Sequence, residues 1–230
     1  MRLTLPILPV KDTVIFPGVE TDITVSRPYM PDALQHAMEN ATPLLVLGRR
    51  PDGQQDNAAA FYTIGVTVQI QNFISEKVGD EYLCSIRAMH RFEVTDVDKA
   101  GTVLLATGRE LAAPSESGTV ESLQQIARIL QLIKQYPGLA KEKLEPAVLE
   151  KANRLASQPE AFADMFSQAL RIPTLLRQGL LETLTPYFRL TRILEILERE
   201  ALAHRIEKEL NDKVRASIDE NQKRYFLNEK

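Results

Sequence analysis

The chain has 230 residues, with 28 basic and 31 acidic side chains, a net charge of −3, one cysteine and no tryptophan. A single cysteine excludes an intramolecular disulfide framework and a multi-cysteine zinc site, and it fits a reducing compartment, so we expect a cytoplasmic protein. The charge balance provides no overall basic field of the kind that binds nucleic acid. No apolar run approaches the ~20 residues of a transmembrane span, so we expect no membrane association.

The first half of the chain is predicted to be mainly β. Pro6 and Pro9 in the first strand suit an edge or entry strand, because proline cannot donate a hydrogen bond to a neighbouring strand. The clearest signal is a hairpin, in which apolar and polar residues alternate on both sides of a turn at residues 78–80. The apolar patterns indicate strands at residues 3–7, 23–25, 44–47, 64–70, 82–88, 92–94 and 103–106.

One helix interrupts this β-rich half, at residues 31–40, with Ala33, Leu34, Ala37 and Met38 on its apolar face. Several short strands and a single helix predict a compact, partly open barrel or a sandwich. Cys84 alternates with Ile86 on one strand and is therefore expected to be a small buried apolar residue.

The composition changes at residues 114–118 (PSESG), a short polar stretch that we predict to be a boundary. Helical periodicity follows, with Thr119 as an N-cap and Pro146, Pro159 and Pro173 at helix starts. The sequence therefore predicts an α+β protein with a β-rich subdomain at 1–114, a helical bundle at 119–185 and a long helix at 186–230.

The last predicted element has neither proline nor glycine after Pro186, so one helix of ~65 Å is expected. Its front half can pack on the bundle, whereas its rear half is mostly charged, with a thin apolar stripe from Ile206 to Ile218. Because Lys230 follows no capping glycine or other stop signal, we expect the chain to be a piece of a longer protein.

Catalytic motifs are absent from the sequence. It has no Gly-Lys dipeptide, which a P-loop requires, and neither a Gly-x-Ser-x-Gly nor a Gly-x-Gly-x-x-Gly motif. His36, His90 and His204 fall on separate predicted elements and form no local pair of metal ligands. We therefore predict that this segment is not an enzyme and that it holds no cofactor, no metal ion and no catalytic residue.

Three stretches resemble the amino-terminal region of Lon, the ATP-dependent serine protease. Residues 5–18 (LPILPVKDTVIFPG) are similar to the opening strand and loop of that family, and residues 61–66 (FYTIGV) to a later strand. Residues 221–230 (NQKRYFLNEK) are similar to the segment that leads into the ATPase module. The resemblance extends over nearly the whole chain and is weakest from residue 103 to 184.

The resemblance implies a PUA-like pseudobarrel, then a helical bundle and a long helix. It implies a substrate-binding role: capture of unfolded, damaged or degron-bearing proteins for a hexameric ATPase and a Ser-Lys protease, in protein quality control. ATP and Mg²⁺ would belong to the full-length parent. The isolated segment could be a monomer or a dimer. DNA binding is reported for such parents, but the charge of this segment does not support it.

Residues that can expose apolar surface at loops and strand ends are the candidates for substrate contact. The predicted substrate-binding residues are Phe16, Pro17, Tyr29, Met30, Phe61 and Tyr62. Two adjacent aromatic residues on the charged long helix, Tyr225 and Phe226, are predicted to contact another helix or module. Two alternatives stay open: an oligomerisation or spacer element that reads no substrate, and a weak nucleic-acid-binding module.

Overall fold

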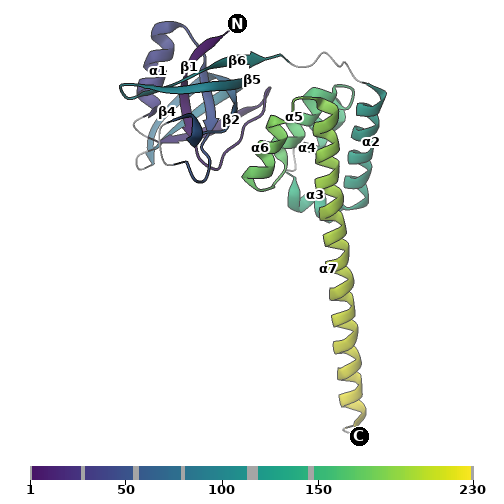
Figure 1. Ribbon diagram of the computed structural model, residues 1–230. Helices are drawn as coiled ribbons and strands as arrows, with labels where there is room; N and C mark the ends of the chain where they lie inside the picture. Colours follow the sequence, from purple (N-terminus) through teal and green to yellow (C-terminus); the bar gives the residue numbers. More distant parts are fainter. Residues whose placement is uncertain are drawn as a thin grey trace.

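The structure is a computed structural model that describes residues 2–26, 29–53, 57–78, 81–112, 119–144 and 148–228. A β-rich unit is followed by a helical unit, from which one long helix projects (Figure 1). The predicted α+β class is therefore confirmed. The change from strand to helix falls between Leu111 and Val120, the region in which the sequence changes composition.

The β-rich unit is a sheet that closes on itself. Its strands pair in the order β2-β5-β4-β3-β1-β6, and β5 also pairs with β6, so that five strands form a barrel and β2 extends it along β5. Only β1 and β3 are parallel among these pairs. The elements are β1 (Leu3–Val10), β2 (Glu20–Ser26), α1 (Tyr29–Asn40), β3 (Leu44–Gly48), a 3-10 helix (Ala58–Ala60), β4 (Ile64–Val78), β5 (Glu81–Ala100) and β6 (Val103–Leu111).

Strand β1 changes its partner halfway along. Residues 3–6 pair with β6, and residues 7–10 pair with β3, so each half of β1 has one neighbouring strand. This arrangement accommodates Pro6 and Pro9, whose nitrogens cannot donate to a second neighbour.

The predicted hairpin is the β4–β5 pair, in which Ile70 lies opposite Ile86 and Phe73 opposite Cys84. Cys84 is fully buried, as predicted, and burial followed by the nearby Asp22 charge raises the pKa of its thiol to about 11. Gly65 of β4 lies where the barrel wall is tight, because a Cβ atom there would be 2.5 Å from the Val46 carbonyl oxygen.

The helical unit contains six helices in its described residues. Thr119 caps the first of them, because its side chain accepts a hydrogen bond from the Ser122 amide. The sequence predicts that the first helix ends at Pro137, and α2 does end at Gln135; Pro137 also begins a further helix, α3, since its missing N–H would be unpaired at a helix start. The helices are α2 (Val120–Gln135), α3 (Pro137–Lys143), α4 (Val148–Leu155), α5 (Pro159–Ala169), α6 (Thr174–Glu182) and α7 (Pro186–Asn228).

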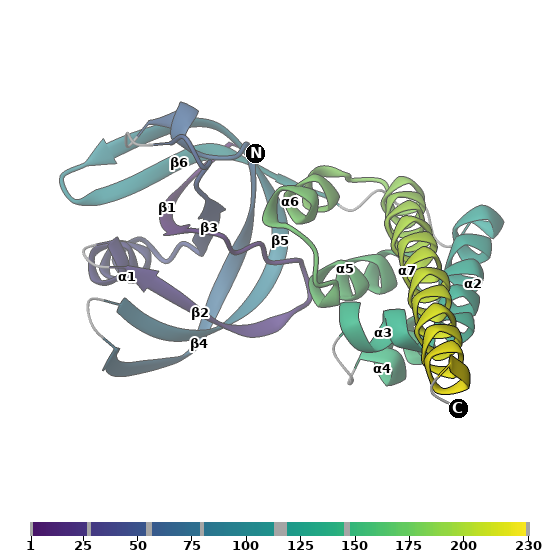
Figure 2. The ribbon, with the colours of Figure 1, turned by 90° about the horizontal axis from the view of Figure 1, so that it is seen from below.

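Helix α7 is packed at its start, and its described side chains further along are exposed. Leu190, Leu194, Leu197 and Ala201 are buried, as predicted, and the first part of α7 lies beside α2 (Figure 2). Every described side chain beyond His204 is exposed. The side chains of Tyr225 and Phe226 lie outside the described residues, so their predicted contacts stay a prediction.

The two units share one hydrophobic core. A single buried cluster includes Val66 and Ile86 of the barrel together with Phe166 and Leu190 of the helical unit. A second cluster fills another part of the barrel around Phe61 and Phe92. The β-rich unit is therefore held against the helices by apolar packing as well as by the polar contacts described below.

Candidate functional site

Two of the predicted substrate-binding residues are buried. Phe16 is 0% exposed and Phe61 is 1% exposed, so the prediction that they belong to a surface patch is wrong. The loop that carries Phe16 is covered by the helical unit, and the Phe16 amide donates a hydrogen bond of 3.2 Å to the Gln168 side chain. Phe61 packs in the second cluster beside Leu45 and Leu47.

The other aromatic candidates gather around two arginines. The Arg49 guanidinium lies 4.6 Å from the Phe61 ring centroid and 5.9 Å from that of Tyr29, and Arg50 lies 5.8 Å from that of Tyr62. Such cation–π contacts occupy the ring faces. The structure therefore brings Tyr29, Phe61 and Tyr62 into one neighbourhood, and it leaves the two tyrosines half-buried.

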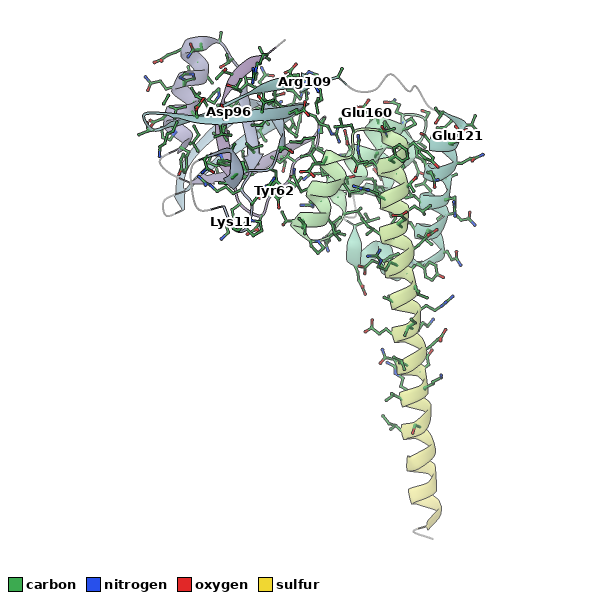
Figure 3. All side chains as sticks on the ribbon, viewed as in Figure 1. Lys11, Tyr62, Asp96, Arg109, Glu121 and Glu160 are labelled. Atoms are coloured by element: carbon green, nitrogen blue, oxygen red, sulfur yellow. The ribbon has the colours of Figure 1, made fainter. Side chains whose placement is uncertain are left out.

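The remaining candidates are Pro17 and Met30. Pro17 is half-buried and lines a small cleft of about 70 Å³ between the two units, together with Met89, His90 and Glu160. Figure 3 shows Glu160 at this junction. The side chain of Met30 lies outside the described residues, although its backbone belongs to α1.

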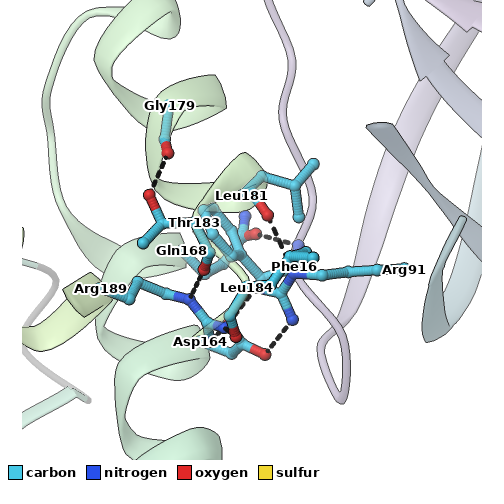
Figure 4. A network of polar contacts seen from close by, with 9 residues as sticks. All are labelled: Phe16, Arg91, Asp164, Gln168, Gly179, Leu181, Thr183, Leu184 and Arg189. Carbon is cyan, nitrogen blue, oxygen red and sulfur yellow. Dashed lines mark hydrogen bonds and ion pairs between the residues drawn. The ribbon is translucent and has the colours of Figure 1, made fainter. Parts of the chain in front are cut away.

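A buried ion network joins the two units close to this cleft (Figure 4). Asp164 on α5 accepts hydrogen bonds of 2.9 and 2.6 Å from the Arg91 guanidinium on β5. The same carboxylate accepts a further hydrogen bond from Arg189, at the start of α7. All three side chains are buried, so the carboxylate is held by two cations in an environment that water barely reaches.

The network sets the charge states of its members. Burial lowers the pKa of the Arg189 guanidinium to about 10, and the Asp164 carboxylate opposes that shift. Arg189 therefore stays protonated at neutral pH. Burial, followed by repulsion from Asp164, raises the pKa of the Glu160 carboxyl, and the charges of Arg189 and Arg91 act in the other direction.

An uncharged concavity lies elsewhere, between α1 and β4. We name it the α1–β4 groove; its volume is about 390 Å³, and all of the residues that line it are uncharged. Met38 on α1 is 75% exposed and Met89 on β5 is 39% exposed, so two flexible thioether side chains border it. Its apolar lining includes Ala37, Met38, Leu44, Val68, Ile70 and Met89.

Met89 owes its position to an irregularity in the sheet. Val66 pairs with Arg91 and Val68 pairs with Ala88, so β5 carries one extra residue opposite Thr67. The buried Thr67 hydroxyl satisfies this β-bulge, because it accepts from the His90 amide at 3.1 Å and donates to the His90 carbonyl at 3.2 Å. A bulge redirects the side chains beside it, here Met89.

Sequence reasoning missed the groove. Met38 was assigned to the buried face of its helix, whereas Ala33 and Ala37 supply that face and Met38 projects from it. Sequence reasoning also missed the ion network, for which one signal was available: Asp164 is a charge between the apolar residues Ala163 and Met165, on a helix that is predicted to belong to the bundle core.

The described residues show neither a metal centre nor a membrane span. Within those ranges, no group of three His, Cys, Asp or Glu side chains is arranged to hold a metal ion. None of the described helices combines the length and the apolar composition that crossing a bilayer requires.

The profile of the family described as the ATP-dependent protease La (LON) substrate-binding domain matches residues 4–199. The chain belongs to the Lon substrate-binding domain family. Curated relatives include Lon protease 2 of Myxococcus xanthus, 25% identical over 97% of this chain and 27% of the relative. The Lon proteases of Solibacter usitatus and Escherichia coli K12 are 28% and 22% identical, over 98% and 99% of this chain and 28% and 29% of their own lengths.

Solved structures of Lon amino-terminal domains share this fold. The N-terminal domain of Mycobacterium avium complex Lon protease has a TM-score of 0.64 at 21% identity, covering 85% of this chain and 97% of its own. The Lon N-terminal domain protein of Xanthomonas campestris has a TM-score of 0.58 at 18% identity, covering 84% and 98%. This Lon domain spans between a quarter and a third of the length of the curated relatives it matches.

Proposed function

We propose that this chain recognises polypeptide substrates for an ATP-dependent Lon-type serine protease and contributes no catalytic residue. The observation that carries the proposal is the match to the Lon substrate-binding domain over residues 4–199. The sequence has no Gly-Lys dipeptide for a P-loop, so nucleotide hydrolysis is assigned to another module. ATP and Mg²⁺ would serve that module rather than this chain.

The proposed substrates are unfolded, damaged or degron-bearing proteins of the cytoplasm, which expose apolar segments that folded proteins bury. The α1–β4 groove supports this class, because it offers uncharged surface bordered by exposed Met38 and Met89. Methionine side chains adapt to many partners and so suit a site that reads apolar character rather than one sequence. In a hexameric parent, six such sites would raise a weak affinity by avidity.

A second role, spacing, is supported by α7. The helix extends ~65 Å, and its described side chains beyond His204 are exposed. These side chains therefore add length to the molecule without contributing to its hydrophobic core. We propose that α7 sets the distance between substrate capture and the ATPase ring. The nucleic-acid alternative is not carried forward, because the net charge of −3 opposes it.

The proposed function is tested by binding to a protein whose folding can be switched. Fluorescence anisotropy would compare labelled α-lactalbumin that is reduced and carboxymethylated with the native form. We expect the chain to bind the unfolded form at ~10 μM or weaker and the native form at least about tenfold more weakly, a difference of about 1.4 kcal/mol. Equal binding, or none, would contradict substrate recognition. A hexamer by light scattering that ignores the unfolded probe would favour a purely assembling role.

A further inference from the structure

Strand β4 has an open edge beside the α1–β4 groove. On one side β4 pairs with β5 along its length, and on the other side it pairs with β3 only from Val66 to Val68. Beyond Val68, no strand among the described residues pairs with β4 on that second side. Main-chain N–H and C=O groups at such an edge are able to pair with an added strand.

The open edge and the groove coincide. Val68, Gln69 and Ile70, the residues at which β3 stops covering β4, are also lining residues of the groove. Because side chains of a strand alternate between two faces, a chain laid along this edge would direct every second side chain toward the apolar lining. The opposite wall is the end of α1, where Ala37 and Met38 lie.

The length of the edge is limited. The β4–β5 register shifts between Ile70 and Asn72, so Gln71 forms a second irregularity two residues after the open edge begins. Such a bulge interrupts the regular ladder locally and bends the strand that carries it. The groove volume of about 390 Å³ also lies near the lower end of the ~300–1,000 Å³ range of ligand pockets. Both observations point to a short occupant.

We propose that the β4 edge binds a short, extended segment of an unfolded polypeptide as an added strand, and that alternate apolar side chains of this segment enter the α1–β4 groove. The inference rests on the proposed function, since it takes the ligand to be a protein substrate. Beyond the proposed function, it names the surface of the domain that binds the substrate. It also states that the bound segment is extended and that apolar residues alternate with polar ones in its preferred sequence. The lining carries no charge, so a charged side chain at an inward position is disfavoured.

The test uses the full 230-residue chain and a fluorescein-labelled decapeptide in which valine alternates with serine between terminal lysines. A second peptide carries N-methyl groups on alternate residues, which remove the N–H donors of one edge while keeping every side chain. Met38→Glu places a charge at the groove, and Leu175→Glu is its matched control, since Leu175 is an exposed leucine on α6, 68% accessible. Anisotropy gives the affinities, and sedimentation velocity gives the oligomeric state.

We expect Met38→Glu and N-methylation each to weaken peptide binding by at least about tenfold, while Leu175→Glu stays within about twofold of wild type. Equal losses for Met38→Glu and Leu175→Glu would overturn the groove as the site. Full affinity for the N-methylated peptide would overturn the added strand. If Met38→Glu changes the sedimentation coefficient but not peptide affinity, the edge pairs with a second copy and the proposal is wrong. If wild type binds neither the decapeptide nor carboxymethylated α-lactalbumin, the proposed function fails as well.

Discussion

The guanidinium of Arg91 and the carboxylate of Asp164 are joined by two parallel hydrogen bonds, although 73 residues separate them in the chain. Arg91 lies on β5 and Asp164 on α5, so the pair fastens the barrel to the helical unit. Arg189 shares the carboxylate, which adds the start of α7 to the same contact. Two cations therefore depend on one anion at the junction of three elements.

Replacing that anion should destabilise the whole fold. Asp164→Asn keeps the side-chain shape but leaves Arg91 and Arg189 buried without a counterion, so we expect the free energy of unfolding to fall by ~3–5 kcal/mol in urea titrations. Glu93→Gln is the control, because its ion pair with Arg109 is largely exposed and should contribute less than ~1 kcal/mol. Similar losses in the two variants would show that the buried network contributes no more to stability than an exposed ion pair does.

The raised pKa of Glu160 predicts a pH-dependent effect. A carboxyl group whose pKa is higher in the folded state binds more protons there than when unfolded, so its contribution to stability falls as pH rises from about 4.5 through the folded pKa. Glu160→Gln removes this titration. The variant should be more stable than wild type at pH 7, and the difference should vanish below pH ~4. Thermal melts across this range check the expectation, and a constant offset at every pH would contradict it.

Two glycines should respond oppositely to the same substitution. In Gly65→Ala, the added methyl group would meet the Val46 carbonyl oxygen at 2.5 Å and a Leu47 methyl at 2.8 Å, so a loss of ~1–3 kcal/mol is expected. In Gly179→Ala, the nearest atom is 3.9 Å away and the residue is inside α6, so helix propensity should add ~0.5–1 kcal/mol. Calorimetry of both variants would show changes in stability of opposite sign. A stabilised Gly65→Ala variant would contradict the close packing of the barrel wall at Gly65.

The bulge beside the groove should link stability to binding. Thr67→Val retains the shape of the side chain but leaves the His90 amide and carbonyl without their partner, at a cost of ~1–3 kcal/mol. Because the bulge positions Met89, the affinity for the valine–serine decapeptide should fall too. Thr4→Val is the control, since its hydroxyl contact with Thr107 is at the surface and should matter by less than ~0.5 kcal/mol. If Thr67→Val is destabilised but binds the decapeptide with unchanged affinity, the bulge does not contribute to the binding site.

Local sequence patterns were sufficient to predict most of the helices and strands. The alternation around Ile70 and Ile86 predicts the β4–β5 hairpin because one face of each strand is buried. The prolines likewise mark helix starts, as predicted at Pro159 and, without a prediction, at Pro137. The closure of the barrel was beyond reach, since it depends on β1, which pairs with β3 and, at Leu3, lies opposite Gly108 of β6 far along the chain.

The candidate site was harder to predict, because exposure is decided by distant residues. Phe16 looks like a loop aromatic in sequence, yet Gln168, 152 residues away, lies against its backbone. Met38 lies about 100° further around α1 than Ala37, which places Ala37 in the core and Met38 at the surface. Neither effect leaves a signal within a local window of sequence.

Among its described side chains, helix α7 is held at its start, where Arg189 enters the network and Leu190 and Leu197 pack on the core. The part from Ile206 to Asn228 extends ~35 Å without described packing. The helix therefore acts as a lever: a tilt of about 10° at Arg189, ~58 Å from Asn228, would displace its far end by ~10 Å. The base is anchored to Asp164, and Asp164 binds Arg91, two residues from the Met89 that borders the groove. Any rotation of this anchored start is therefore enlarged at the far end of the helix.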